Sequence, residues 1–145
     1  MFELLTGDYL FDPQSGTKYG KDDDHVAQII ELLGSVPQEI AMSGKWSGEI
    51  FNRRGELRNI HRLRHWAIAD VLRDKYHLDP PEADIISSFL VPMLQVDAKK
   101  RADAGGMSSH PWLTNTRGME QISLGLETGA CGDGITGWAS EVKRA

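Results

Sequence analysis

Two carboxylates, those of Asp24 and Glu31, lie seven residues apart in a segment that reads as an amphipathic helix. Seven residues make about two helical turns, so both side chains share one face. The apolar positions of the same segment fall outside that face: Val26, Ile29, Ile30 and Leu33. Arginine guanidinium groups bind carboxylates through paired hydrogen bonds. The spacing therefore predicts an acidic face that could bind basic groups, although ordinary surface charges are the simpler alternative.

The acidic residues of the chain are concentrated near its start. Up to Gly34 there are seven acidic and two basic residues, and beyond Gly34 acids and bases are equal in number, so this segment accounts for the net charge of −5. Such an imbalance argues for a basic partner and against nucleic acid as the main one. Taken alone, composition favours a solvated acidic helix start.

The composition excludes several other classes of protein. A length of 145 residues allows one domain with a core, and no apolar run approaches the length of a membrane helix. The first residues lack the basic start of a signal peptide, and a single cysteine, Cys131, cannot form an internal disulfide. The cytoplasm or nucleus is the expected location. No metal site is expected from the histidine spacing, and the Arg53–Arg64 stretch is interrupted by Glu56 and carries no nucleic-acid-binding motif.

Helical periodicity dominates the pattern, so the expected fold class is mainly α. Helices are expected over residues 2–5, 22–33, 37–40, 66–76, 80–94 and 103–110. Gly7 and Gly34 should end helices, Asp22 or Asp23 should cap one, and Pro92 should kink another. A small hook or hairpin is expected around Gly55, between Phe51 and Leu57. Residues 114–145 are rich in glycine and are expected to be mostly disordered.

Several ordered motifs point to a known family. Pro92-Met-Leu94, Lys100-Arg101-Ala102 and His110-Pro-Trp-Leu113 together resemble the end of a protein kinase C-lobe. The segments Gly7-Asp-Tyr-Leu-Phe11, Asp23-Asp-His25, Ile29-Ile-Glu-Leu-Leu-Gly34 and Asp74-Lys-Tyr76 narrow this to the SR-protein kinase family. The resemblance covers Met1 to about Leu113. It implies a partial C-lobe over residues 1–113, running from the end of the central helix to the last helix.

The resemblance also implies site residues. In this family an acidic groove holds an Arg-Ser-rich substrate, and the groove residues carry over to Asp8, Asp24, Glu31 and Lys75. Lys75 could separate the carboxylates, accept a phosphate from the product, or simply pair with an acid on its own helix.

Two further residues carry over in structural roles. Arg101 matches the arginine that pairs with the glutamate of the Ala-Pro-Glu motif, and Trp112 lies at the end of the last helix. Because that motif is missing from this sequence, Arg101 must reach water or another acid such as Asp97.

The parts of a kinase that perform the chemistry are absent from the sequence. It contains no Gly-rich loop, Val-Ala-Ile-Lys strand, His-Arg-Asp loop, Asp-Phe-Gly or Ala-Pro-Glu, which hold ATP, Mg²⁺ and the substrate hydroxyl in the parent family. One interpretation is a fragment of an SR-protein-kinase-like enzyme, inactive alone, that lacks its N-lobe and upstream C-lobe. The start inside an apolar helix favours it. The other is a catalytically dead module that binds Arg-rich peptides by itself.

Overall fold

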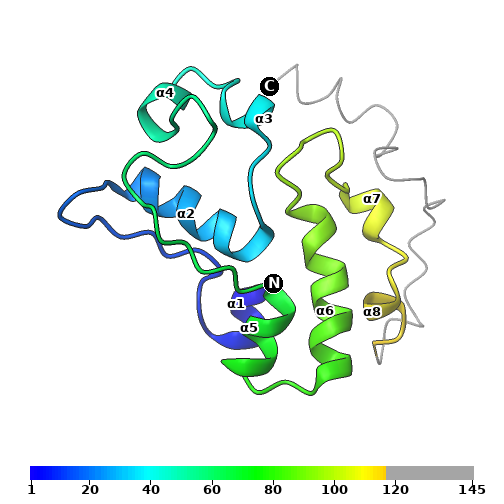
Figure 1. The fold of residues 1–145 in the computed structure, drawn as a ribbon. Coiled ribbons are helices and arrows are strands. Elements are labelled where there is room, and N and C mark those ends of the chain that lie inside the picture. Colours follow the sequence, from blue (N-terminus) through cyan, green and yellow to red (C-terminus); the bar gives the residue numbers. More distant parts are fainter. Residues whose placement is uncertain (117–145) are drawn as a thin grey trace, which may run out of the picture. The chain divides into compact units, whose positions relative to one another are not determined.

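The computed structural model describes residues 1–116, and these divide into two compact units, one over Met1–His77 and the other from Leu78 onward. Within the described residues the regular structure consists of helices and one isolated antiparallel bridge (Figure 1). The mainly helical fold class is thereby confirmed. The predicted disorder of the glycine-rich segment concerns residues that, from 117 onward, lie outside the described part.

The first unit begins with the short helix α1 (Phe2–Thr6) and the longer α2 (Lys21–Leu33). Gly7 ends α1 with φ 80°, a left-handed conformation that glycine adopts without strain. Gly20 is the N-cap of α2, and its backbone N–H donates to the Asp23 carboxylate at 3.0 Å. The predicted N-cap, Asp22 or Asp23, was wrong: the helix begins earlier, and Asp23 binds the N-cap N–H from the third helical position, where a negative charge also suits the helix dipole.

Two one-turn helices, α3 (Gln38–Ala41) and α4 (Ser47–Ile50), lead into the predicted hook. Phe51 and Leu57 pair as an antiparallel bridge, and Gly55 turns the chain with φ 78°. Both bridge residues are buried in a core with Ala27 of α2 and Ala41 of α3. The hook is therefore held by side-chain packing beneath it as well as by its backbone hydrogen bonds.

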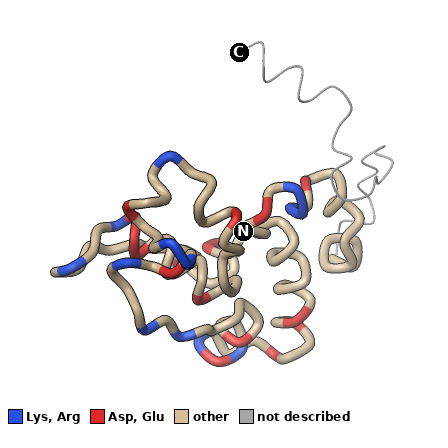
Figure 2. Tube along the Cα trace, turned by 45° about the horizontal axis from the view of Figure 1, so that its top comes forward, with Lys and Arg blue, Asp and Glu red and all other residues tan. Residues whose placement is uncertain are grey.

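An extended segment, residues 59–66, runs from the hook to α5 (Ile68–Asp74) and lies against α2. Asn59 Nδ2 donates to Asp23 Oδ1 at 3.0 Å, and the Trp66 N–H donates to the Glu31 carbonyl at 2.8 Å. The segment is thus fastened to both ends of the helix. Figure 2 marks the acidic and basic residues along the chain trace.

The second unit is built on α6 (Pro80–Met93), followed by α7 (Ala104–Met107) and α8 (Pro111–Thr114). Phe89 of α6 stacks on Trp112 with ring centroids 5.0 Å apart. Pro92 lies in the last turn of α6, and the carbonyl of Pro92 accepts a hydrogen bond from the Ala102 N–H. One boundary prediction was wrong: Pro111 begins a helix instead of ending the last one, because proline fits the first helical turn, where no N–H is needed.

Candidate functional site

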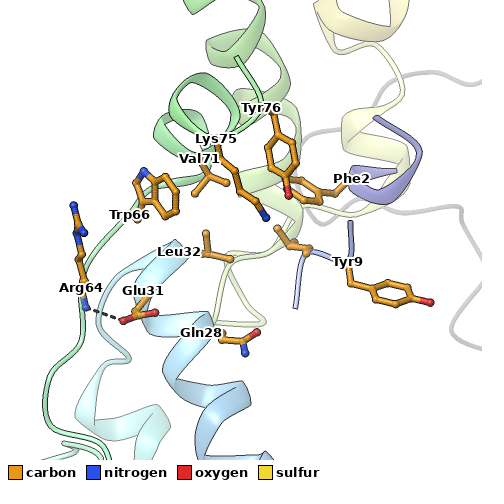
Figure 3. A pocket seen from close by; sticks show the side chains of 11 residues that line it. Phe2, Tyr9, Gln28, Glu31, Leu32, Arg64, Trp66, Val71, Lys75 and Tyr76 are labelled. Carbon is orange, nitrogen blue, oxygen red and sulfur yellow. Dashed lines mark hydrogen bonds between the residues drawn. The ribbon is translucent and has the colours of Figure 1, made fainter. Parts of the chain in front are cut away.

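A pocket of about 370 Å³ opens on the first unit, lined by the ends of α1, α2 and α5 and by the extended segment. Its lining combines apolar, aromatic and charged side chains, shown in Figure 3: Phe2, Tyr9, Leu10, Gln28, Glu31, Leu32, Arg64, Trp66, Val71, Lys75 and Tyr76. We call it the Glu31 pocket. Glu31 is its only carboxylate, while Trp66, Tyr9 and Tyr76 supply rings and Lys75 and Arg64 supply cations.

Glu31 is fixed by the extended segment. Its Oε1 accepts a hydrogen bond of 2.8 Å from the backbone N–H of Arg64, and the Arg64 guanidinium points away from it (Figure 3). No ion pair involves Glu31 within residues 1–116, and its second carboxylate oxygen has no hydrogen bond there. One oxygen is therefore used to position the side chain, and the other remains available to a donor from outside.

Lys75, which also lines the pocket, forms an ion pair with Asp8, although the two residues are far apart in the sequence. Lys75 Nζ lies 2.9 Å from Asp8 Oδ2, and the Tyr76 hydroxyl donates to the same oxygen at 2.7 Å. These two donors, Lys75 first, hold the pKa of Asp8 below its ordinary value. The Tyr76 hydroxyl and Asp8 raise the pKa of Lys75. Both side chains are about half exposed, so water weakens the pair.

Asp24 is engaged in a different contact. Its Oδ2 accepts hydrogen bonds of 2.8 Å from the Gln14 backbone N–H and from Gln28 Nε2. Gln28 in turn bonds to both the N–H and the carbonyl of Asp12. Asp24 therefore holds the loop before α2 against the helix, and it does not line the Glu31 pocket.

The four predicted groove residues thus lie in one unit but do not form one open row. Glu31 and Lys75 line the pocket, Asp8 reaches it through Lys75, and Asp24 is turned toward the loop. The sequence analysis missed the pocket's aromatic wall and the part played by Arg64. Trp66 and Tyr76 were visible as large apolar residues in a segment predicted to be helical, but a backbone N–H that binds a carboxylate has no signature in sequence.

The two predicted structural residues lie in the second unit. Arg101 is exposed, and its Nε donates to the Gln95 carbonyl at 2.8 Å. Asp97 pairs with Lys100 instead, at 4.0 Å. Arg101 therefore reaches water, the first of the two outcomes expected for it. Trp112 packs on Phe89, as described above.

The lining offers two kinds of contact to a planar cation. A guanidinium can donate to the free oxygen of Glu31 while its flat face stacks on an aromatic ring. Within residues 1–116 no group of three or more potential metal ligands occurs. None of the helices over the same residues is long and apolar enough to span a bilayer.

Comparison with known proteins places the chain among kinases. It is 54% identical to protein kinase dsk1 of Schizosaccharomyces pombe and 53% identical to serine/threonine-protein kinase SKY1 of Saccharomyces cerevisiae, in each case over 144 residues or 99% of the chain. It is 53% identical to human SRSF protein kinase 3 over 112 residues. No protein-family model matches the chain.

These alignments cover only part of each relative. The chain spans 26% of the fission yeast kinase, 19% of the budding yeast kinase and 20% of the human kinase. Both yeast alignments extend past Leu113, where the resemblance found in the sequence was expected to end, and the human alignment covers 77% of the chain. With about half of all positions identical over nearly its whole length, the chain belongs to the SR-protein kinase family, of which it spans one segment.

Proposed function

We propose that this chain is the substrate-docking segment of a serine/threonine kinase that phosphorylates Arg-Ser-rich proteins in the cytoplasm or nucleus. In this proposal, residues 1–113 form the second half of a kinase C-lobe, and the Glu31 pocket holds arginine side chains of the substrate. The observation that carries the proposal is that a carboxylate with a free oxygen, Glu31, and an aromatic ring, Trp66, line the same pocket of about 370 Å³.

The chemistry of the pocket supports arginine over lysine. A guanidinium can bond to a carboxylate and stack on a ring at once, whereas an ammonium is compact and strongly hydrated. One exposed pair of this kind contributes about 0.2–1 kcal/mol. A repeat in which every second residue is arginine offers many equivalent ligands to one pocket, so a weak site can be refilled from the same chain.

Phosphoryl transfer itself is not assigned to these residues. The Glu31 pocket has one carboxylate and no glycine, and the sequence lacks the loops that cradle ATP and Mg²⁺ in kinases. The residues present therefore do not fit that cofactor pair. We expect the chain alone to show no turnover with ATP, Mg²⁺ and an Arg-Ser peptide.

The experiment that tests docking compares two charge-removing variants of the full chain. Glu31→Gln keeps an oxygen that accepts the Arg64 N–H, so the pocket should stay intact while its charge is lost. Fluorescence anisotropy with a labelled Arg-Ser octapeptide should show an affinity loss of about fivefold, equal to ~1 kcal/mol. Glu39→Gln removes an equally negative, exposed side chain from α3, outside the pocket, and serves as the control.

Two results would contradict the proposal. One is unchanged peptide affinity in a folded Glu31→Gln variant, and the other is an equal loss in Glu39→Gln. A peptide with lysine in place of arginine should bind more weakly, and the binding of both should weaken as salt is added.

A further inference from the structure

A second pocket of about 590 Å³ lies on the first unit, between the start of α2 and α4. Its lining includes Asp22, Asp23 and His25 of α2 and Trp46 and Glu49 of the α4 region. We call it the Trp46 pocket. No residue is shared between its lining and that of the Glu31 pocket.

Trp46 is the most distinctive part of this pocket. It is 59% exposed, which is unusual for the largest apolar side chain. The ammonium group of Lys45 lies 4.6 Å from the centre of its ring, within the range of a cation–π contact. The ring face is thus already in contact with a cation from the chain itself.

The carboxylates around this ring are largely free. Within residues 1–116, neither Asp22 nor Glu49 takes part in a side-chain hydrogen bond or an ion pair, while Asp23 is engaged with Gly20 and Asn59. An exposed ring that lines one pocket with two free carboxylates is complementary to a guanidinium, which stacks with its face and donates from its edge.

The two pockets open on different sides of α2. Asp22 and Glu31 are nine residues apart, which is about 2.5 turns and 13 Å along the axis, so they lie on opposite faces of the helix. A path over the helix surface from one face to the other is roughly 20 Å, since the helix is ~10 Å wide. An extended chain covers about 3.4 Å per residue, so roughly six residues are needed to span it.

We propose that the Trp46 pocket is a second arginine-binding site, filled by an arginine about six residues away from the one in the Glu31 pocket. The proposal rests on the docking function above and adds a length requirement to it. A long Arg-rich segment could occupy both pockets, whereas a short one could occupy only one.

Three labelled peptides of equal composition test this requirement by fluorescence anisotropy on the full chain. One carries two arginines separated by five Gly/Ser residues, so that they are six positions apart, another has the two arginines separated by one residue with the remainder moved outside, and the third has them adjacent. The five-residue spacer should give at least about threefold tighter binding than the other two, because the second contact becomes intramolecular. Equal affinity for all three peptides would overturn the proposal.

Variants test whether the tighter binding of the long-spacer peptide comes from the Trp46 pocket. Trp46→Ala and Glu49→Gln should remove the advantage of the long spacer and leave the affinity for the adjacent-pair peptide unchanged. Lys45→Met, which clears the ring of its own cation, should increase that advantage, and Glu39→Gln should change neither quantity. A long-spacer advantage that survives Trp46→Ala in a chain with unchanged circular dichroism would also refute the second site.

The same series separates this inference from the docking proposal. Loss of affinity for every peptide in Glu31→Gln supports docking at the first pocket, whatever the effect of Trp46. If Glu31→Gln has no effect but Trp46→Ala weakens binding of all peptides, the docking proposal fails and the Trp46 pocket is the main arginine site.

Discussion

Leu57 connects the core of the first unit to the segment that forms one wall of the Glu31 pocket. Its side chain is 4% exposed and packs in the cluster with Phe51, Ala27 and Ala41. Replacement of a buried leucine by alanine costs about 2–5 kcal/mol, depending on how far the surroundings collapse. Leu57 also borders a pocket of about 460 Å³, which water can enter, so we expect Leu57→Ala to cost about 2–3 kcal/mol.

Hydrogen exchange measures this loss where it occurs. The Arg58 N–H donates to the Ile50 carbonyl at 2.9 Å and the Asn52 N–H to the Glu56 carbonyl at 2.8 Å, so both amides report on opening of the hook. A loss of ~2–3 kcal/mol corresponds to exchange faster by roughly 30- to 150-fold at these two amides. A local probe is preferable to a global melt because the chain has two units that need not unfold together.

The matched control is Leu63→Ala, which makes the same chemical change at a leucine that is 36% exposed. It should cost less than about 1 kcal/mol and leave the hook amides protected. Equal exchange rates in the Leu57 and Leu63 variants would refute the assignment of Leu57 as the anchor of the hook. In Leu57→Ala, affinity for an Arg-Ser peptide should also fall, because the hook is continuous with the segment that holds Glu31.

Three further perturbations test the local geometry. Gly55→Ala should lower the free energy of unfolding by about 1–3 kcal/mol, because φ is 78° and the new Cβ would lie 3.2 Å from a backbone atom of α3. Urea denaturation measures this loss, and an unchanged midpoint would contradict the prediction. Asp24→Ala should speed hydrogen exchange in the loop before α2 by about tenfold, with no change at the hook amides. Because the pKa of Asp8 is lowered, its ion pair with Lys75 stabilises the fold at neutral pH. This stabilisation is lost as the pH falls from the ordinary carboxyl pKa of 3.8 through the lowered pKa of Asp8. A carboxyl titration by NMR should place Asp8 below that value, and Lys75→Met should return it toward 3.8.

Local sequence patterns were sufficient for much of the fold. The α2 and α6 segments have long apolar periodicity, and Gly7 and Gly34 end helices as predicted, with positive φ values that glycine adopts readily. The shorter helices were harder, since α4, α7 and α8 each cover a single turn and depend on their surroundings more than on propensity.

The site was less accessible to sequence reasoning because its contacts join distant residues. Asp8 and Lys75 are 67 residues apart, and neither residue type nor spacing indicates that they pair. The helical spacing correctly placed Asp24 and Glu31 on one helix. It gave no sign that Asp24 accepts two hydrogen bonds from residues of its own chain, a contact that depends on how the preceding loop folds back.

These internal contacts have a consequence for the proposed docking. Asp8 already holds an ammonium and a hydroxyl, Asp24 holds two N–H donors, and Glu31 holds one. Each of the three carboxylates uses one oxygen for these bonds, so a guanidinium could reach the other oxygen at any of them; at Asp8, however, the ammonium of Lys75 would repel it, and Asp24 does not line the Glu31 pocket. Of these three carboxylates, Glu31 alone lines the pocket, and it has no ion-pair partner within residues 1–116. The first arginine contact is therefore expected at Glu31, and further affinity should come from additional sites, such as the Trp46 pocket, more than from the two neighbouring carboxylates.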